Sequence, residues 1–228
     1  MKFKKLAMAA AIAAVAGVAG VSHATTVTSE VLTSGDVVGN WRIAFPVGIS
    51  LIYDGGLSSA PNLVIEKNAA FDSTEGLDIT FTQVSSSAAP TITITDESVT
   101  NVSGSSWSGF QFLLATDTGG TPSAFGPGEA FNGSTPPFST QTDSSNDIAL
   151  SGGSLGNTDT AKWGFGADGG QLTIDANPGS TSSPKVFELK EIPVVTAVPV
   201  PAAAWTGLSG LVGLGLIAGA KRIKRQVA

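Results

Sequence analysis

The side chains of this chain that could do chemistry are carboxylates, hydroxyls and aromatic rings. The sequence has no cysteine, and its one histidine is His23, close to the N-terminus. Ser-His-Asp triads, thiolate nucleophiles, disulfides and zinc sites built from His and Cys are therefore excluded from the rest of the chain. Glycoside hydrolysis needs only two carboxylates about 5 to 9.5 Å apart, and the eighteen acidic residues permit it. No pair stands out, because Asp96 and Glu97 are neighbours at the end of a predicted strand and should project differently, so we expect a protein that is not an enzyme.

Calcium is the alternative use of the acidic residues. Five hard oxygen ligands lie in predicted loops, namely Asp143, Asp147, Asn157, Asp159 and Asp168, and Ca²⁺ prefers ligands of this type. Their spacing matches neither an EF-hand loop nor a nonapeptide calcium repeat. Because Asp and Asn are also favoured in turns, we expect no cofactor, with calcium as the minor alternative.

Flat aromatic rings indicate a second kind of site, since they stack well against sugar rings. The candidates are Trp41, Tyr53, Trp107 and Trp163. Each tryptophan lies within an apolar run, which favours the core. Trp107 departs from the same-face alternation that Phe110 and Phe112 share, so we expect its ring to point outward and name it as the candidate ligand-binding residue.

The elements that would position these side chains are short strands. Leu77, Ile79 and Phe81 recur with period two and share one strand face, and Thr91-Ile92-Thr93-Ile94-Thr95 repeats this pattern with β-branched residues. Ten strands are predicted, at residues 41–45, 49–53, 63–65, 77–84, 91–95, 107–114, 147–150, 163–165, 171–174 and 185–191. No long helix is predicted before residue 202.

Turn-forming residues separate these strands. The segment Asp168-Gly169-Gly170 is the best candidate for a hairpin turn, joining the strands on either side of it. Residues 117–141 are rich in proline and glycine and predict a long surface excursion. Together the patterns predict an all-β fold, an antiparallel β-sandwich with the jelly-roll as its variant.

The N-terminal segment has the architecture of a secretory signal peptide. Lys2, Lys4 and Lys5 precede an apolar core, and Ser22-His23-Ala24 supplies small residues at the cleavage positions. Cleavage is expected between Ala24 and Thr25. The expected partners at this stage are the Sec translocon and signal peptidase.

The C-terminal segment predicts a transmembrane helix. No charge occurs from Ile192 to Ala220, and Lys221, Arg222, Lys224 and Arg225 follow. At about 1.5 Å per residue, residues 202–220 would span roughly 28 Å, close to the hydrocarbon thickness of a bilayer. The basic residues favour a cytoplasmic C-terminus and anchoring in the inner membrane.

A proline-rich entry precedes this apolar run and carries a more specific signal. The segment Val198-Pro199-Val200-Pro201-Ala202, with Trp205 shortly after it, leads into the helix and the basic tail. This order resembles the PEP-CTERM sorting signal, in its Val-Pro-x-Pro-Ala form, of exported proteins of Gram-negative bacteria. The resemblance implies processing by an exosortase-like membrane protease and release or transfer to the cell surface. An anchor that is never cut is the alternative.

These signals divide the chain into a signal peptide (residues 1–24), a β-sandwich domain (25–196) and a sorting segment (197–228). The domain holds eighteen acidic and five basic residues, a net charge of −13, which repels nucleic acid. We expect an exported cell-surface or extracellular-matrix protein with a structural or adhesive role, with extracellular polysaccharide as an expected partner. A carbohydrate-binding, lectin-like module is the first alternative and a carboxylate-only glycoside hydrolase the second.

Overall fold

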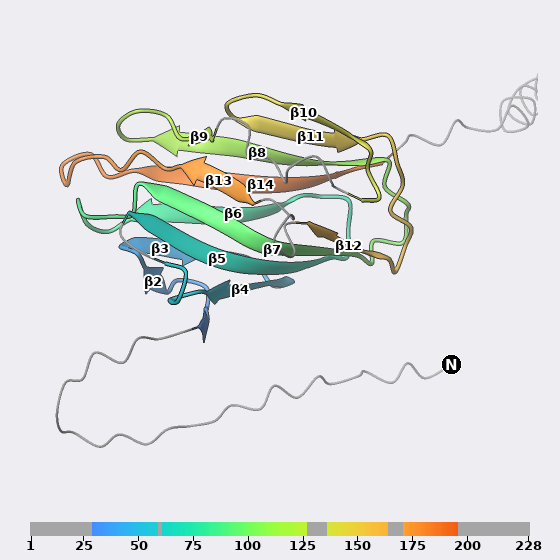
Figure 1. Cartoon of the computed structure of the whole chain (residues 1–228), viewed down its shortest axis with the longest axis horizontal. Coiled ribbons are helices and arrows are strands. Elements are labelled where there is room, and N and C mark those ends of the chain that lie inside the picture. The colour runs from blue at the N-terminus through green and yellow to red at the C-terminus, as the bar shows by residue number, and fades with distance from the viewer. Residues whose placement is uncertain (1–28, 59–60, 127–135, 164–170, 196–228) are drawn as a thin grey trace, which may run out of the picture.

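The protein is all-β in the part of the chain that its computed structural model describes, which comprises residues 29–58, 61–126, 136–163 and 171–195. Two seven-stranded sheets pack face to face, and their strands run across the view in Figure 1. None of the described residues belongs to a helix long and apolar enough to cross a membrane. The predicted span at residues 202–220 lies outside these ranges.

Each sheet combines strands from distant parts of the chain. The first sheet has the order β1 (Glu30–Val31), β4 (Ile49–Tyr53), β5 (Asn62–Phe71), β7 (Thr91–Asn101), β13 (Leu172–Asp175) and β9 (Ala124–Phe125), with β12 (Thr160–Trp163) also paired to β7. The second has the order β10 (Thr140–Asp143), β11 (Asp147–Ser151), β8 (Gly109–Thr118), β14 (Val186–Val194), β6 (Leu77–Gln83), β3 (Trp41–Ala44) and β2 (Val37–Val38). Strands β5 and β7 pair in parallel, so the first sheet is mixed and the expectation of a wholly antiparallel sandwich is wrong in this respect. The jelly-roll variant stays a prediction.

One core lies between the two sheets. Along β5 the alternate residues Leu63, Ile65, Lys67, Ala69 and Phe71 are all buried, as expected for the inward face of a strand. The ring of Phe71 meets Phe110 of the opposite sheet edge to face, with centroids 5.5 Å apart. The inward row of β5 therefore faces β8, and one of its members is a lysine.

A bulge in β7 changes which of its residues face this core. Opposite β5, the register passes from Glu66 with Thr95 to Asn68 with Ser98, so β7 has one extra residue there. The buried core residues of β7 are consequently Ile92 and Ile94 before the bulge and Val99 after it. Asp96 and Glu97 thus lie within a long strand, and the expectation that they sit at a strand end is wrong.

Two further expectations are corrected by the strand pairing. Strands β12 and β13 both pair with β7, β12 along residues 97–100 and β13 along residues 91–94. They lie end to end on one side of β7, so the predicted hairpin between them is wrong. Within the predicted surface excursion at residues 117–141, residues 120–122 and 136–137 are exposed. The segment also contributes to the sandwich, because β9 pairs with β13 and Ser123 is buried.

Candidate functional site

Trp107, the residue expected to point outward, lies in the core. Its side chain is 0% exposed, and its ring packs edge to face against Phe71 at a centroid distance of 5.3 Å. The indole Nε1 donates a hydrogen bond to the Ser103 hydroxyl at 3.0 Å. The expectation is therefore wrong, because the backbone of Trp107 precedes β8 as an isolated bridge to Leu155 and does not follow the alternation of Phe110 and Phe112.

Among the four aromatic candidates, only Tyr53 keeps part of its surface in solvent. Trp41 and Trp163 are fully buried, and their indole nitrogens donate to the backbone oxygens of Ala89 and Pro136. Tyr53, by contrast, is half-buried at the end of β4. It is the one aromatic candidate that a ligand can reach in this structure.

Tyr53 lines a cavity of about 410 Å³, within the range of about 300 to 1,000 Å³ that is usual for small-molecule sites. Its polar lining consists of Asn40, Ser58, Asn62 and Ser87 together with Tyr53, and its apolar lining includes Leu63, Ala88 and Pro90. We call this cavity the Tyr53 pocket. None of its lining residues carries a charge, so the pocket suits a neutral ligand that has both polar groups and an apolar face.

The wall of the Tyr53 pocket is held by a tight turn between β2 and β3. Gly39 and Asn40 both have positive φ, 54° and 61°, as a type I′ hairpin turn requires. The Gly39 carbonyl accepts a hydrogen bond from the Ala89 backbone N–H at 2.9 Å, and the Asn40 carbonyl accepts one from Val84 at 3.0 Å. The turn and the β6–β7 loop are thus tied together before any ligand arrives.

Several polar groups of the Tyr53 pocket are only partly used by the protein. The Asn40 side-chain nitrogen donates to the Ser87 backbone oxygen at 3.1 Å, and Asn62 Oδ1 accepts a hydrogen bond from the Thr93 hydroxyl at 3.0 Å. Asn40 Oδ1 and Asn62 Nδ2 have no hydrogen bond to another described residue. The pocket therefore offers an acceptor and a donor beside an aromatic ring, which is the combination that binds sugar hydroxyls and the apolar face of a sugar ring.

The described residues considered as calcium ligands lie in two places, Asp143 and Asp147 at the turn between β10 and β11, and Asn157 and Asp159 in the loop before β12, and they use their oxygens locally. Asp147 Oδ1 accepts from Gln111 Nε2 at 2.9 Å, and Asp159 Oδ2 accepts from the Gly156 backbone at 3.1 Å. Asn157 Oδ1 accepts from the Gly104 backbone N–H at 2.9 Å. Across the described ranges, no group of three or more His, Cys, Asp or Glu is placed to hold a metal ion. Asp168 lies outside those ranges.

The most unusual charges of the protein are enclosed between the sheets. Lys67 of β5 lies 2.7 Å from Glu191 Oε2 of β14 and 2.5 Å from Glu97 Oε1 of β7, and all three side chains are 0% exposed. We call these residues the buried triad. In the strand register Glu97 is opposite Trp163 and Glu191 is opposite Phe112, so apolar rings adjoin the charges. A soluble substrate has no access to these carboxylates in the folded domain.

Burial and mutual attraction shift the protonation equilibria of the buried triad. Burial raises the pKa of Glu97 to about 8, against the opposing effect of Lys67 and with a further contribution from Glu191. Burial likewise raises the pKa of Glu191, again opposed by Lys67. For Lys67 burial alone lowers the pKa, but the attraction of the two carboxylates outweighs it and the pKa is raised. The raised pKa values favour a triad that keeps a proton on its two carboxyl groups while Lys67 stays charged.

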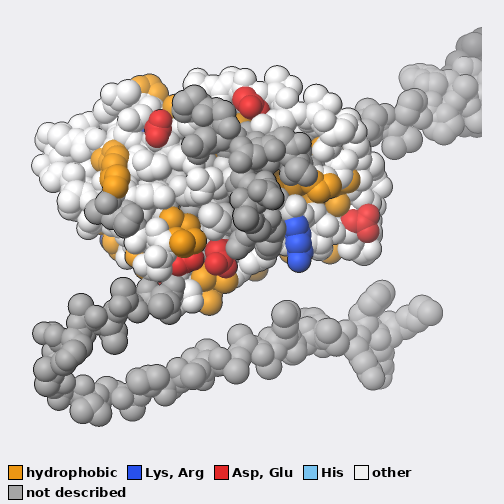
Figure 2. Space-filling model, in the orientation of Figure 1, with side chains coloured by type: hydrophobic (Ala, Val, Ile, Leu, Met, Phe, Trp, Pro, Cys, Tyr) orange, Lys and Arg blue, Asp and Glu red, His pale blue; other side chains and the backbone are white. Residues whose placement is uncertain are grey.

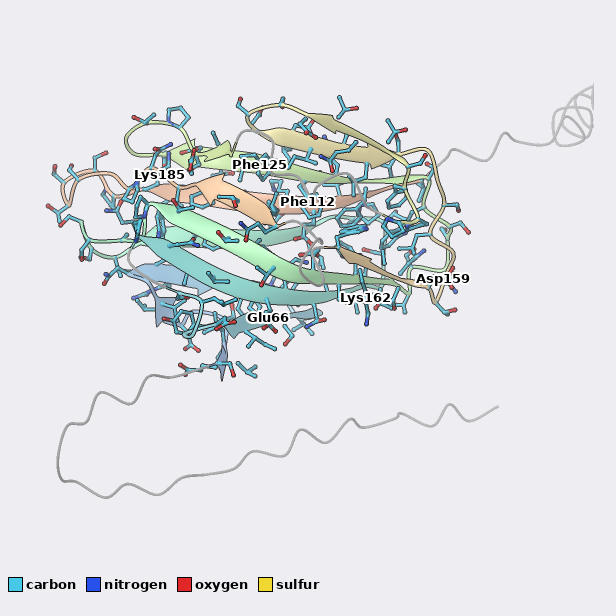
Figure 3. The ribbon with its side chains drawn as sticks, viewed as in Figure 1. Glu66, Phe112, Phe125, Asp159, Lys162 and Lys185 are labelled. Atoms are coloured by element: carbon cyan, nitrogen blue, oxygen red, sulfur yellow. The ribbon has the colours of Figure 1, made fainter. Side chains whose placement is uncertain are left out.

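A second buried ion pair lies at one end of the strands. Lys185 is fully buried and pairs with Asp117, and its ammonium also donates to the Thr121 carbonyl oxygen at 2.6 Å. Figure 3 shows Lys185 and Asp159 at opposite ends of the sandwich. On the face drawn in Figure 2, hydrophobic and acidic side chains lie in small, separate groups.

A scan against protein-family models, a search of the curated proteins and a search of the solved structures each found no match to this chain. The remaining predicted site residues lie outside the described ranges. These are the signal-cleavage residues Ala24 and Thr25, the sorting-motif residues Val198, Pro199, Pro201, Ala202 and Trp205, and the cytoplasmic anchor Lys221, Arg222, Lys224 and Arg225.

Proposed function

We propose that this chain is an exported cell-surface protein whose β-sandwich has a structural or adhesive, non-enzymatic role. In this proposal the N-terminal signal directs export, and the Pro-x-Pro segment, apolar run and basic tail direct anchoring and processing by an exosortase-like membrane protease. The resemblance of the C-terminal segment to PEP-CTERM signals supports the proposal.

The structural observation that carries the proposal is the position of β14. This strand lies inside the second sheet, paired with β6 on one side and with β8 on the other, and it ends at Val194, shortly before the sorting segment. A pulling force on the C-terminal tail would act on the backbone hydrogen bonds that join β14 to β6 and to β8. A domain tethered in this way resists extraction better than one tethered by an edge strand, which suits a structural or adhesive role.

The intact mass of the protein recovered from the surface or medium of its native host tests the proposal. We expect a mass that lacks residues 1–24 and the segment after about Pro199. Replacing Pro199 and Pro201 by alanine should leave the tail in place, whereas the matched variant Val195→Ala should be processed normally. Unprocessed protein confined to membranes would contradict the surface location.

The Tyr53 pocket favours carbohydrate binding as a second candidate function, and such binding would supply the adhesive contact. A neutral pyranose ring suits a pocket with a tyrosine ring, two asparagine side chains and no charged lining residue. A polysaccharide of the extracellular matrix would present such rings in many copies, so weak single sites could act together.

A glycan array, followed by calorimetry with the best ligand, tests this second candidate. Tyr53→Ala should abolish binding while the protein remains folded, and Tyr53→Phe should retain the contribution of ring stacking. Val47→Ala is the matched control, because Val47 is fully exposed and lies outside the pocket lining. If no neutral sugar binds saturably, or if Tyr53→Ala binds as well as the wild type, the pocket has no such role.

A further inference from the structure

The buried triad connects the two sheets at the strand that leads to the C-terminal tail. We propose that Lys67 and Glu191 condense within the folded domain to form an amide that joins β5 covalently to β14, with Glu97 transferring the protons. The inference deepens the proposed structural role, on which its biological purpose rests. Its chemistry is measured on the purified chain and does not depend on where the protein is located.

The geometry places the two reacting groups together. Lys67 Nζ and Glu191 Oε2 are 2.7 Å apart, which leaves the nitrogen roughly 3.5 Å from the carboxyl carbon, close to the separation from which bonds form. Both side chains come from the inward rows of strands in opposite sheets and are fully buried. Such fixed proximity gives a reaction a high effective concentration and replaces a collision between separate molecules.

As separate ions, the members of the buried triad are poorly compensated. Two carboxylates face one ammonium, and neither oxygen of Glu97 nor Oε1 of Glu191 has a hydrogen-bond partner among the described residues. Glu97 Oε1 contacts Lys67 Nζ as an ion pair. Buried charges are costly unless they are both paired and hydrogen-bonded. Condensation removes one ammonium and one carboxylate from the core.

The triad can also reach the reactive protonation state. Both carboxyl groups have raised pKa values because they are buried, so both are good proton acceptors. The ammonium of Lys67 has a raised pKa only because the carboxylates attract it, since burial alone lowers the pKa. When Glu97 holds one proton and Glu191 takes one from Lys67, that attraction is lost, and a neutral amine faces a neutral carboxylic acid.

The reaction balances without any further reagent. The Lys67 Nζ lone pair attacks the carboxyl carbon of Glu191. Protonated Glu97 gives its proton to the Glu191 hydroxyl from one oxygen and takes a proton from the nitrogen at its other oxygen, the C–O bond breaks, and one molecule of water leaves. The product is a secondary amide, with Glu97 again protonated. Loss of water from an apolar core opposes the reverse hydrolysis, because hydrolysis would need water in that core.

The product would satisfy groups that are unsatisfied in the ionic form. The oxygen retained from Glu191 becomes an amide oxygen and can accept a hydrogen bond from the protonated Glu97. No formal charge then remains in the triad at neutral pH. A covalent link between β5 and β14 would also connect the first sheet directly to the strand that bears the tail.

Peptide mapping of the purified full-length chain tests the inference. Digestion with a protease that cleaves after glutamate should yield segment 67–75 joined to a segment that begins at residue 189, lighter than the sum of the two by one water. Fragmentation should place the bond between Lys67 and Glu191. Unmodified linear peptides alone, or a bond from Lys67 to Glu97, would overturn the assignment.

Three variants complete the test by intact mass. The wild type should lack one water relative to its sequence, and Lys67→Met and Glu191→Gln should not. Succinimide formation at Asp54-Gly55 or Asp168-Gly169 also releases water, but it would persist in Lys67→Met and so is distinguished. Glu97→Gln should slow formation of the link by about a hundredfold or more, as expected for loss of a proton-transfer group. Full linkage in freshly folded Glu97→Gln would overturn the role of Glu97, and the wild-type map decides the link itself even if a variant fails to fold.

Discussion

Replacing Trp107 by alanine should destabilise the fold rather than remove a ligand contact. The side chain is 0% exposed, contacts Phe71 and Phe110 through its ring, and donates a hydrogen bond to Ser103. Truncation of a buried tryptophan to alanine costs about 3 to 5 kcal/mol of unfolding free energy. That loss is a large share of the roughly 5 to 15 kcal/mol that stabilises an ordinary domain.

Urea unfolding followed by far-UV circular dichroism measures this effect. With a slope of about 3 kcal/mol per M, the midpoint should fall by roughly 1 to 2 M. Trp107→Phe is the matched control, because it keeps an aromatic ring against Phe71 and loses mainly volume and the hydrogen bond, so its midpoint should lie between those of the wild type and Trp107→Ala. A change within about 0.5 kcal/mol for Trp107→Ala, as for an exposed side chain, would refute the burial argument.

Three other predictions concern charges and the turn at the Tyr53 pocket. The pKa of Glu97 is raised from 4.5 to about 8 in the folded protein, so between these two pH values the folded state binds a proton that the unfolded state has lost. The free energy of unfolding should therefore fall as pH rises from 4.5 to about 8. Urea unfolding curves measured across this pH range should show a smaller fall for Glu97→Gln than for the wild type. The direction also holds after amide formation, since the ammonium that lowers this pKa is then gone. Asp117→Ala should lower the free energy of unfolding by about 3 kcal/mol, because it leaves the buried Lys185 ammonium without its counter-ion. Lys185→Met should lower it less. Urea unfolding measures both, and equal stability of Asp117→Ala and the wild type would contradict the prediction. Asn40→Ala should lose about 1 to 2 kcal/mol, because Asn40 has a φ of 61° that alanine disfavours, whereas Asn40→Gly should be nearly neutral by the same measurement.

Local patterns in the sequence were sufficient to locate most strands. The predicted strands at residues 49–53 and 77–84 correspond to β4 and β6. Alternating apolar and polar residues suit a strand with one face toward the core and the other toward solvent, and turn-forming residues mark the ends of the strand. The strands β1, β2, β9 and β10 have no counterpart among the predicted strands. The first three have two residues each, too few to show alternation, and β10 (Thr140–Asp143) has no apolar residue.

The sites depended on tertiary packing. The sequence did identify Tyr53 as an aromatic candidate, but the Tyr53 pocket brings it together with Asn40 and Asn62 only through the pairing of distant strands and loops. No local signal distinguishes an indole ring that faces solvent from one that faces the core when it lies outside a regular strand, and for this reason Trp107 was placed wrongly.

The buried triad shows most clearly what the amino-acid sequence determined and what only the tertiary structure decided. The sequence determined an all-β chain rich in acidic residues, because residue types and their period-two order are properties of the chain itself. A lysine in the middle of a strand, such as Lys67, is in isolation more favourably placed in water. Its inward position was decided by the bulge that turns Glu97 toward the core and by the opposing sheet that supplies Glu191, since a charge can remain buried only where packing brings its partners to it.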